Sequence, residues 1–175
     1  MKKVIATPDA PKAVGPYSQA IEVNGMVYTS GVIPVNPATG EIPEGTVAQA
    51  NQALSNLKNL LEAAGTSMNN VIKTTVFIKE MNEFGTINEV YKEYFTSDFP
   101  ARSCVEVARL PKDVLLEIEA TVKGRGGRRF VTGKLDVALE AGALAHGEIS
   151  RGHITHNSSL ADQHRPADEI GNLFN

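Results

Sequence analysis

Histidine is absent from residues 1–123 of this 175-residue chain, and all four histidines follow Gly124. Residues 1–123 therefore cannot hold a Ser–His or Cys–His nucleophile pair, nor a zinc site of the usual His and Cys type. The spacing of the four histidines matches no metal-ligand pattern either, so we expect no metal site. Chemistry in residues 1–123 must use Arg, Glu, Tyr, Ser, Cys or backbone groups.

Cysteine and long apolar runs are also scarce. The single cysteine, Cys104, cannot form an internal disulfide, and a reducing compartment is the default for such a chain. No apolar run approaches the roughly 18 residues of a transmembrane helix. The start, MKKVIATPDAPKAV, lacks the apolar segment of a signal peptide. We therefore expect a cytoplasmic protein with no membrane partner.

Excess positive charge is the third absence. The net charge is −3, and 42% hydrophobic with 21% charged residues is the composition of an ordinary globular protein. Such a chain does not attract nucleic acid or anionic membranes electrostatically. We expect the partner to be a small molecule or another protein, and not a nucleic acid.

Local patterns predict the first elements. Asn24-Gly25 lies between the strand-like runs 17–23 and 26–30 and predicts a hairpin. Apolar residues three and four apart from Thr46 onward predict a helix, with Thr46 and Gln49 as a capping box and Gly65 as its end.

The following segments complete an α+β pattern. The β-branched run 71–78 predicts a strand buried on both faces or nearly so, and Asn82 is expected to cap a second helix. A pair of strands joined by a turn at 108–113 follows. This order predicts a mixed sheet with two helices packed on one face, and self-association is the simplest way to cover the other face.

The character of the chain changes after Lys123. Residues 124–175 are dotted with glycine, balanced in charge and weakly periodic, so they predict no second core. We expect one domain over residues 1–123 and a C-terminal extension over residues 124–175. Three interpretations of the extension stay open: a disordered segment, a docking or targeting peptide with a protein partner, or sequence foreign to the parent gene.

Two alternating runs in PARSCVEVARLPKDVLLEIEA carry the candidate chemistry. Arg102 and Cys104 share one strand face, and Glu117 and Glu119 share another run of alternate positions. A guanidinium fits a carboxylate with two parallel donors, and a carboxyl group can move protons. Cys104 has no histidine base, so it is interpreted as a wall of the site and not as a nucleophile. Alternation does not choose between Glu117 and Glu119.

Several motifs resemble one family. GPYSQA (15–20), YTSG (28–31), INEVY (87–91) and above all RSCVEVARLPKD with EIEA resemble the reactive intermediate deaminases, the Rid or YjgF-YER057c-UK114 family. The resemblance covers residues 2–123. INEVYKEYF followed by PARSCVEVARLPKD is similar to the members linked to anaerobic threonine catabolism.

The resemblance implies a fold and an activity. It implies chorismate-mutase-like α+β subunits in a barrel-like homotrimer with sites at the subunit interfaces. It implies hydrolysis of 2-enamine and 2-imino acids, released by pyridoxal-phosphate enzymes, to a 2-keto acid and ammonia. No metal or cofactor is implied.

The resemblance also implies roles for individual residues. Arg102 aligns with the carboxylate-binding arginine, Glu117 with the glutamate that orients water, and Tyr17 with a lid over the ligand. Asn88 matches a position near the site, whereas Ser30 and Gly31 are chosen because small residues at a strand end allow close approach of a ligand. The predicted catalytic residues are Glu117 and Arg102, and the predicted substrate-binding residues are Arg102, Tyr17, Ser30, Gly31, Cys104 and Asn88.

Two other functions remain beside the deaminase. A non-catalytic trimer that binds 2-keto acids such as 2-ketobutyrate would use the same arginine, so the sequence discriminates poorly between sensor and enzyme. An RNA-cleaving translation inhibitor is the third possibility, and the net negative charge and the lack of histidine in residues 1–123 argue against it.

Overall fold

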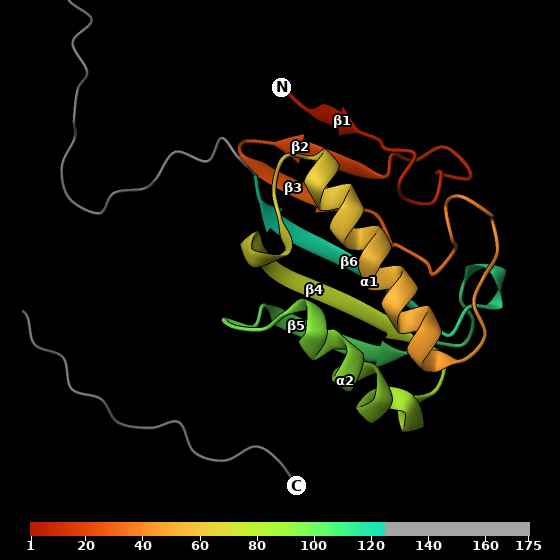
Figure 1. Ribbon diagram of the computed structural model, residues 1–175. Helices are drawn as coiled ribbons and strands as arrows, with labels where there is room; N and C mark the ends of the chain where they lie inside the picture. Colours follow the sequence, from red (N-terminus) through yellow and green to blue (C-terminus); the bar gives the residue numbers. More distant parts are fainter. Residues whose placement is uncertain (125–175) are drawn as a thin grey trace, which may run out of the picture. The chain divides into compact units, whose positions relative to one another are not determined.

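The computed structural model describes residues 1–124, which form one six-stranded mixed sheet with two α-helices on one of its faces (Figure 1). The sheet order is β1-β2-β3-β6-β4-β5. The α+β fold predicted from the sequence is thus confirmed. The predicted extension, residues 124–175, lies outside the described residues apart from Gly124. The elements are β1 (Lys3–Ile5), β2 (Ala20–Val23), β3 (Met26–Thr29), α1 (Thr46–Ala63), β4 (Val71–Ile78), α2 (Phe84–Tyr94), β5 (Ala101–Glu106) and β6 (Leu116–Lys123), with the short 3-10 turns η1 (Met68–Asn70), η2 (Met81–Glu83) and η3 (Pro111–Asp113).

The hairpin between β2 and β3 has the predicted turn. Asn24 and Gly25 both adopt positive φ, 52° and 74°, as a two-residue turn of the I′ type requires. The strands pair in antiparallel register from Val23 opposite Met26 to Ala20 opposite Thr29. This short-range prediction is confirmed.

Helix α1 packs one apolar stripe on the sheet. It begins at Thr46 and is followed by Gly65 with φ 75°, so the predicted start and end are confirmed. The predicted capping box is wrong, because no side chain caps the helix. The core residues of the stripe are Ala50, Ala53, Leu54, Leu57, Leu60 and Leu61, each at most 1% exposed.

Strand β4 coincides with the predicted run, but it is buried on one face only. Thr74, Val76 and Ile78 lie under the helices at 1% exposure or less, while the residues between them are more exposed. The prediction of burial on both faces or nearly so is therefore wrong for the single chain, because both helices cover the same face (Figure 1). Thr74, the polar member of the buried row, bonds through its hydroxyl to that of Tyr91 at 2.8 Å.

Helix α2 begins later than Asn82 predicts. Asn82 lies inside the turn η2, and α2 starts at Phe84 with no side-chain cap. Neither α1 nor α2, the two α-helices of residues 1–124, has the combination of length and apolar character that a membrane span requires.

The two strands that flank the 108–113 turn are not neighbours. β4 lies between them, parallel to β5 and antiparallel to β6. The predicted strand pair is therefore wrong. Helix α2 forms a crossover connection from the end of β4 to the start of β5, so that β5 pairs in parallel with β4 at the sheet edge. β6 then returns between β4 and β3.

Three buried side-chain amides hold the loops at one end of this sheet. Gln19 accepts a hydrogen bond from the Thr7 amide at 2.7 Å, and its Nε2 donates to the carbonyls of Thr7, Ala10 and Pro11. Gln49, which the sequence suggested as part of a cap, donates to the Pro43 carbonyl. It also accepts from the Leu115 amide.

Asn56 is the third amide and is fully buried on α1. Its Nδ2 donates to the carbonyls of Ile33 and Val35 at 3.0 and 2.8 Å, and its Oδ1 accepts from Gln52. Irregular backbone leaves some of its polar groups without a backbone partner, and these amides supply partners for several of them.

We expect Asn56→Leu to destabilise the fold by about 2 kcal/mol or more, because the Val35 carbonyl loses its buried donor. Asn59→Leu is the matched control, since Asn59 makes one exposed bond to the Asp9 carbonyl, and it should cost less than about 1 kcal/mol. Urea unfolding of both variants measures the difference. Equal losses would contradict the role given to Asn56.

Candidate active site

A cavity opens at the end of the sheet where β3 ends and β6 begins. Three connections gather at this end: the one between β1 and β2, the one between β3 and α1, and the one between β5 and β6 (Figure 1). The cavity has a volume of about 660 Å³. Much of its wall is apolar, and its polar residues include Tyr17, Gln19, Ser30, Asn36 and Glu117.

Glu117 is the carboxyl group of the cavity. It lies half-buried on β6, opposite Phe77 of β4, and its side chain passes over Gly31. A Cβ at position 31 would overlap the carboxyl group of Glu117. Gly31 was predicted to make room for a ligand, and in the structure it makes room for this carboxyl group.

The pKa of Glu117 is raised above the ordinary glutamate value. Burial is the main cause, and the neighbouring negative charge of Glu119 adds to it. A carboxyl group with a raised pKa exchanges protons closer to neutral pH, which suits it to act as both acid and base. Of the two acids that the sequence left open, Glu117 is the one that lines the cavity.

Ser30 and Tyr17 lie on the wall and the rim of the same cavity. The Ser30 hydroxyl donates to the Ser18 carbonyl at 2.7 Å, and so holds its oxygen in place. Tyr17 is 49% exposed, and its hydroxyl accepts a hydrogen bond from the Val14 amide. Gly15, with φ 124°, allows the turn that brings Tyr17 over this loop.

Arg102 lies elsewhere, on β5 against α2. Its Nη1 donates to Asn88 Oδ1 at 2.8 Å, and its guanidinium carbon lies 4.7 Å from the ring centre of Tyr91 and 5.3 Å from that of Phe84. The aromatic rings and the Asn88 amide hold the guanidinium plane in a defined orientation. Arg102, Asn88 and Cys104 do not belong to the lining of the Glu117 cavity.

The register explains this separation. Arg102 is opposite Thr74 on β4, which faces the helices, whereas Glu117 is opposite Phe77, which faces away from them. Alternate residues of a strand point to opposite faces, so the sheet lies between Arg102 and Glu117 of one chain. A single subunit therefore does not enclose a small ligand between this arginine and this carboxylate.

Cys104 is half-buried on the same face as Arg102. Burial raises the pKa of the Cys104 thiol, and the Arg102 charge only partly opposes that rise. A thiol with a raised pKa is mainly protonated at neutral pH and is a weak nucleophile. This agrees with its interpretation as a wall.

Sequence reasoning missed several residues that build the cavity. Gln49 and Asn56 are polar residues on the apolar stripe of α1, and that break in the pattern was a usable signal. Gln19 carries no such signal, because its partners are backbone groups of an irregular loop. Lys112 also lines the cavity, and a lysine at this position does not predict the left-handed backbone that it adopts.

The raised pKa of Glu117 makes a prediction about stability. The folded state holds this proton to higher pH than the unfolded state does, so ionisation costs stability as pH rises above the unfolded pKa. Glu117→Gln removes that cost. Its Tm should exceed that of the parent at about pH 7.5, and the gain should disappear by about pH 4.

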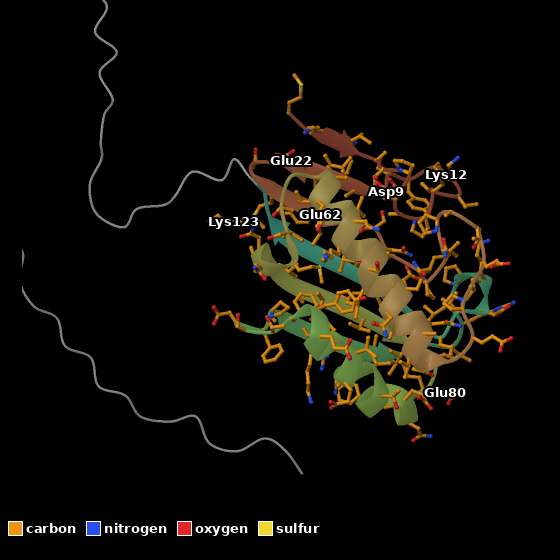
Figure 2. All side chains as sticks on the ribbon, viewed as in Figure 1. Asp9, Lys12, Glu22, Glu62, Glu80 and Lys123 are labelled. Atoms are coloured by element: carbon orange, nitrogen blue, oxygen red, sulfur yellow. The ribbon has the colours of Figure 1, made fainter. Side chains whose placement is uncertain are left out.

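The control for this experiment is Glu80→Gln, which removes an exposed carboxylate that does not belong to the cavity lining; Figure 2 labels Glu80. Calorimetric melting of the three proteins across the pH range gives the comparison. A stabilisation of Glu117→Gln that grows toward low pH would contradict a raised pKa of Glu117.

Comparisons with known proteins agree with this architecture. The family described as Endoribonuclease L-PSP matches residues 7–123. A protein of Escherichia coli K12 named 2-iminobutanoate/2-iminopropanoate deaminase is 56% identical over 123 residues, which cover 69% of this chain and 96% of that protein.

Two solved structures have the same fold. Escherichia coli TdcF with bound serine is 54% identical, with a TM-score of 0.67, and the match covers 69% of this chain and 98% of that one. RidA from the Antarctic bacterium Psychrobacter sp. PAMC 21119 is 43% identical, with a TM-score of 0.68, over 69% and 98% of the two chains. The chain belongs to the Endoribonuclease L-PSP family, which is the Rid family that its motifs resemble.

Proposed function

We propose that this protein hydrolyses small 2-imino acids and their 2-enamine tautomers to 2-keto acids and ammonia. The observation that carries the proposal is Glu117, a half-buried carboxyl group with a raised pKa, set over Gly31 in a largely apolar cavity. The 56% identity to a protein named 2-iminobutanoate/2-iminopropanoate deaminase supports the choice of substrate class.

Glu117 would manage the protons of this reaction. Water attacks the imine carbon, and the C=N bond becomes a C–N single bond as the nitrogen takes up a proton. Glu117 accepts the proton that the attacking water loses and gives it to the nitrogen, which yields a tetrahedral intermediate with a hydroxyl and an amino group. Glu117 then takes the hydroxyl proton as the C=O bond forms and passes it to the amino group, which leaves as ammonia. One carboxyl group can serve both steps because its pKa lies nearer the working pH than that of an exposed glutamate.

Arg102 would bind the substrate carboxylate from a neighbouring subunit. We infer a homotrimer in which the Arg102 face of one chain lies against the Glu117 cavity of the next, because the two groups lie on opposite faces within a chain. The uncovered sheet face and the β5 edge support association, since Val4, Tyr28 and Val105 are 57%, 46% and 43% exposed there.

The other predicted residues would then have distinct tasks. Asn88 holds the Arg102 guanidinium, and Cys104 forms part of the wall beside it. Tyr17 covers the rim of the cavity, while Ser30 and Gly31 shape the wall around Glu117. None of these tasks needs a cofactor.

The proposal also concerns the source of the substrate. Dehydratases that use pyridoxal phosphate, such as threonine dehydratase, release 2-enamines that tautomerise to 2-imines, and we place this protein after such an enzyme in the cytoplasm. The chemistry assigned to the protein lies within residues 1–123. A docking role for residues 124–175 with a protein partner stays a separate hypothesis.

A coupled assay tests the role of Glu117. Threonine dehydratase supplies the imine, and semicarbazide competes for it, so the yield of semicarbazone falls when the protein hydrolyses the imine. Glu117→Gln should lower kcat about a hundredfold or more, because proton transfer by a positioned group contributes at least that much. Affinity for 2-ketobutyrate, measured by calorimetry, should change little.

The control for the assay is Glu80→Gln, which should behave as the parent does. If the parent binds 2-ketobutyrate but does not reduce semicarbazone formation, the protein is a 2-keto acid sensor and the deaminase proposal is wrong.

Arg102 is tested by two substitutions in the same assay. Arg102→Ala should lower kcat/KM about ten- to a hundredfold, mainly through KM, because a charge-assisted contact with the carboxylate is lost. Arg102→Lys keeps the positive charge but loses the two parallel donors of the guanidinium. Its kcat/KM should therefore lie between those of Arg102→Ala and the parent. An Arg102→Ala protein as active as the parent would falsify this role.

A further inference from the structure

The turn η3 next to the cavity has an unusual backbone. Lys112 has φ 56° and ψ 20°, and Asp113 has φ 55°, so two consecutive residues adopt the left-handed conformation. A residue other than glycine is strained in this conformation, because its Cβ comes close to the following carbonyl oxygen. Glycine or asparagine would remove much of that strain, so the presence of lysine suggests that its side chain has a task.

Contacts on both sides hold the turn in this shape. Leu110 and Val114 are buried at 6% and 1% exposure, and the Asp113 amide donates to the Leu110 carbonyl. Arg109 binds the Asp113 carboxylate with both Nε and Nη2, at 2.6 and 3.0 Å. The nearest acid in sequence is therefore engaged by Arg109 and not by Lys112.

Lys112 is exposed and lines the same cavity as Glu117. The charged residues of the cavity lining are Glu117 and two lysines, Lys112 and Lys12. Lys12 extends from the loop after β1 at the same end of the sheet, close to Asp9 (Figure 2). The lining thus carries more positive than negative charge, which favours an anionic ligand beside an ionisable carboxyl group.

We propose that Lys112 is a substrate-capture residue, whose ammonium group draws the carboxylate of the imino acid into the cavity. This role rests on the proposed function and adds to it. Arg102 would fix the bound carboxylate through a planar fork, whereas Lys112 acts as a point charge at the entrance. An exposed point charge acts over a distance that salt shortens, so its effect should depend on ionic strength.

Lys112→Asn is the central variant, because asparagine tolerates the left-handed backbone and carries no charge. At low ionic strength its kcat/KM should fall about tenfold, through KM, with kcat within about twofold of the parent. The loss should shrink to about twofold or less in roughly 0.5 M salt. Lys112→Arg keeps the charge, so its kcat/KM should remain close to that of the parent at both salt concentrations.

Lys58→Asn is the matched control. It removes the same charge from an exposed position on α1, where Lys58 pairs loosely with Glu62, outside the cavity lining. It should leave kcat/KM and its salt dependence unchanged. Lys112→Gly, which carries no left-handed strain, replaces Lys112→Asn if that variant does not fold.

Titration with 2-ketobutyrate separates this inference from the proposed function. The affinity of Lys112→Asn for this anion should fall about tenfold at low salt, whether or not the parent turns over an imine. A parent that binds the keto acid without turnover would overturn only the deaminase. Equal affinity and equal kcat/KM in the parent and Lys112→Asn, or equal losses in Lys58→Asn, would overturn the capture role.

Discussion

The register of β4 between β5 and β6 is the constraint on which the arrangement of the site depends. Thr74 pairs with Arg102 on one side and with Ala120 on the other, and this row faces the helices. Three rows further along β4, Phe77 pairs with Glu117, and this row faces away from the helices. Since a strand alternates its side chains, the arginine and the glutamate are separated by the sheet itself. A site that uses both groups on one small molecule therefore requires a second subunit.

Hydrogen bonds from three buried side-chain amides shape the loops around the cavity that holds Glu117. Gln19 holds the loop between β1 and β2 by its carbonyl groups, and Asn56 holds the loop between β3 and α1 in the same way. Gln49 connects that second loop to the amide of Leu115, directly before β6. These bonds give several loop carbonyl groups a partner where the loops form a largely apolar wall. The apolar wall in turn raises the pKa of Glu117, for which Gly31 leaves room. Fold stability and acid–base chemistry are linked in this way, since the same burial that tunes the carboxyl group opposes its ionisation.

Local sequence patterns predicted much of the fold, whereas the pairing of strands that are distant in the chain was not predicted. The Asn24-Gly25 hairpin and the extent of β4 follow from neighbours in the chain, and both were predicted. The position of β4 between β5 and β6 depends on the crossover through α2, which the alternation of residues 102–119 does not reveal. The predicted site residues consequently divide into a Glu117 group and an Arg102 group. The left-handed backbone at Lys112 was also not predicted from the sequence, because contacts of Arg109 and of the buried residues around the turn hold it in that conformation.

Complementation between two inactive variants tests the shared site most directly. Arg102→Ala and Glu117→Gln, carrying different affinity tags, are co-expressed, and the assembly that carries both tags is assayed for imine hydrolysis. If Arg102 of one chain serves the Glu117 cavity of the next, each trimer that carries both tags has one intact site out of three and restores about a third of the parental activity per subunit. If each chain uses its own Arg102 and Glu117, the mixed assembly stays inactive, and the account of a site shared between subunits is wrong.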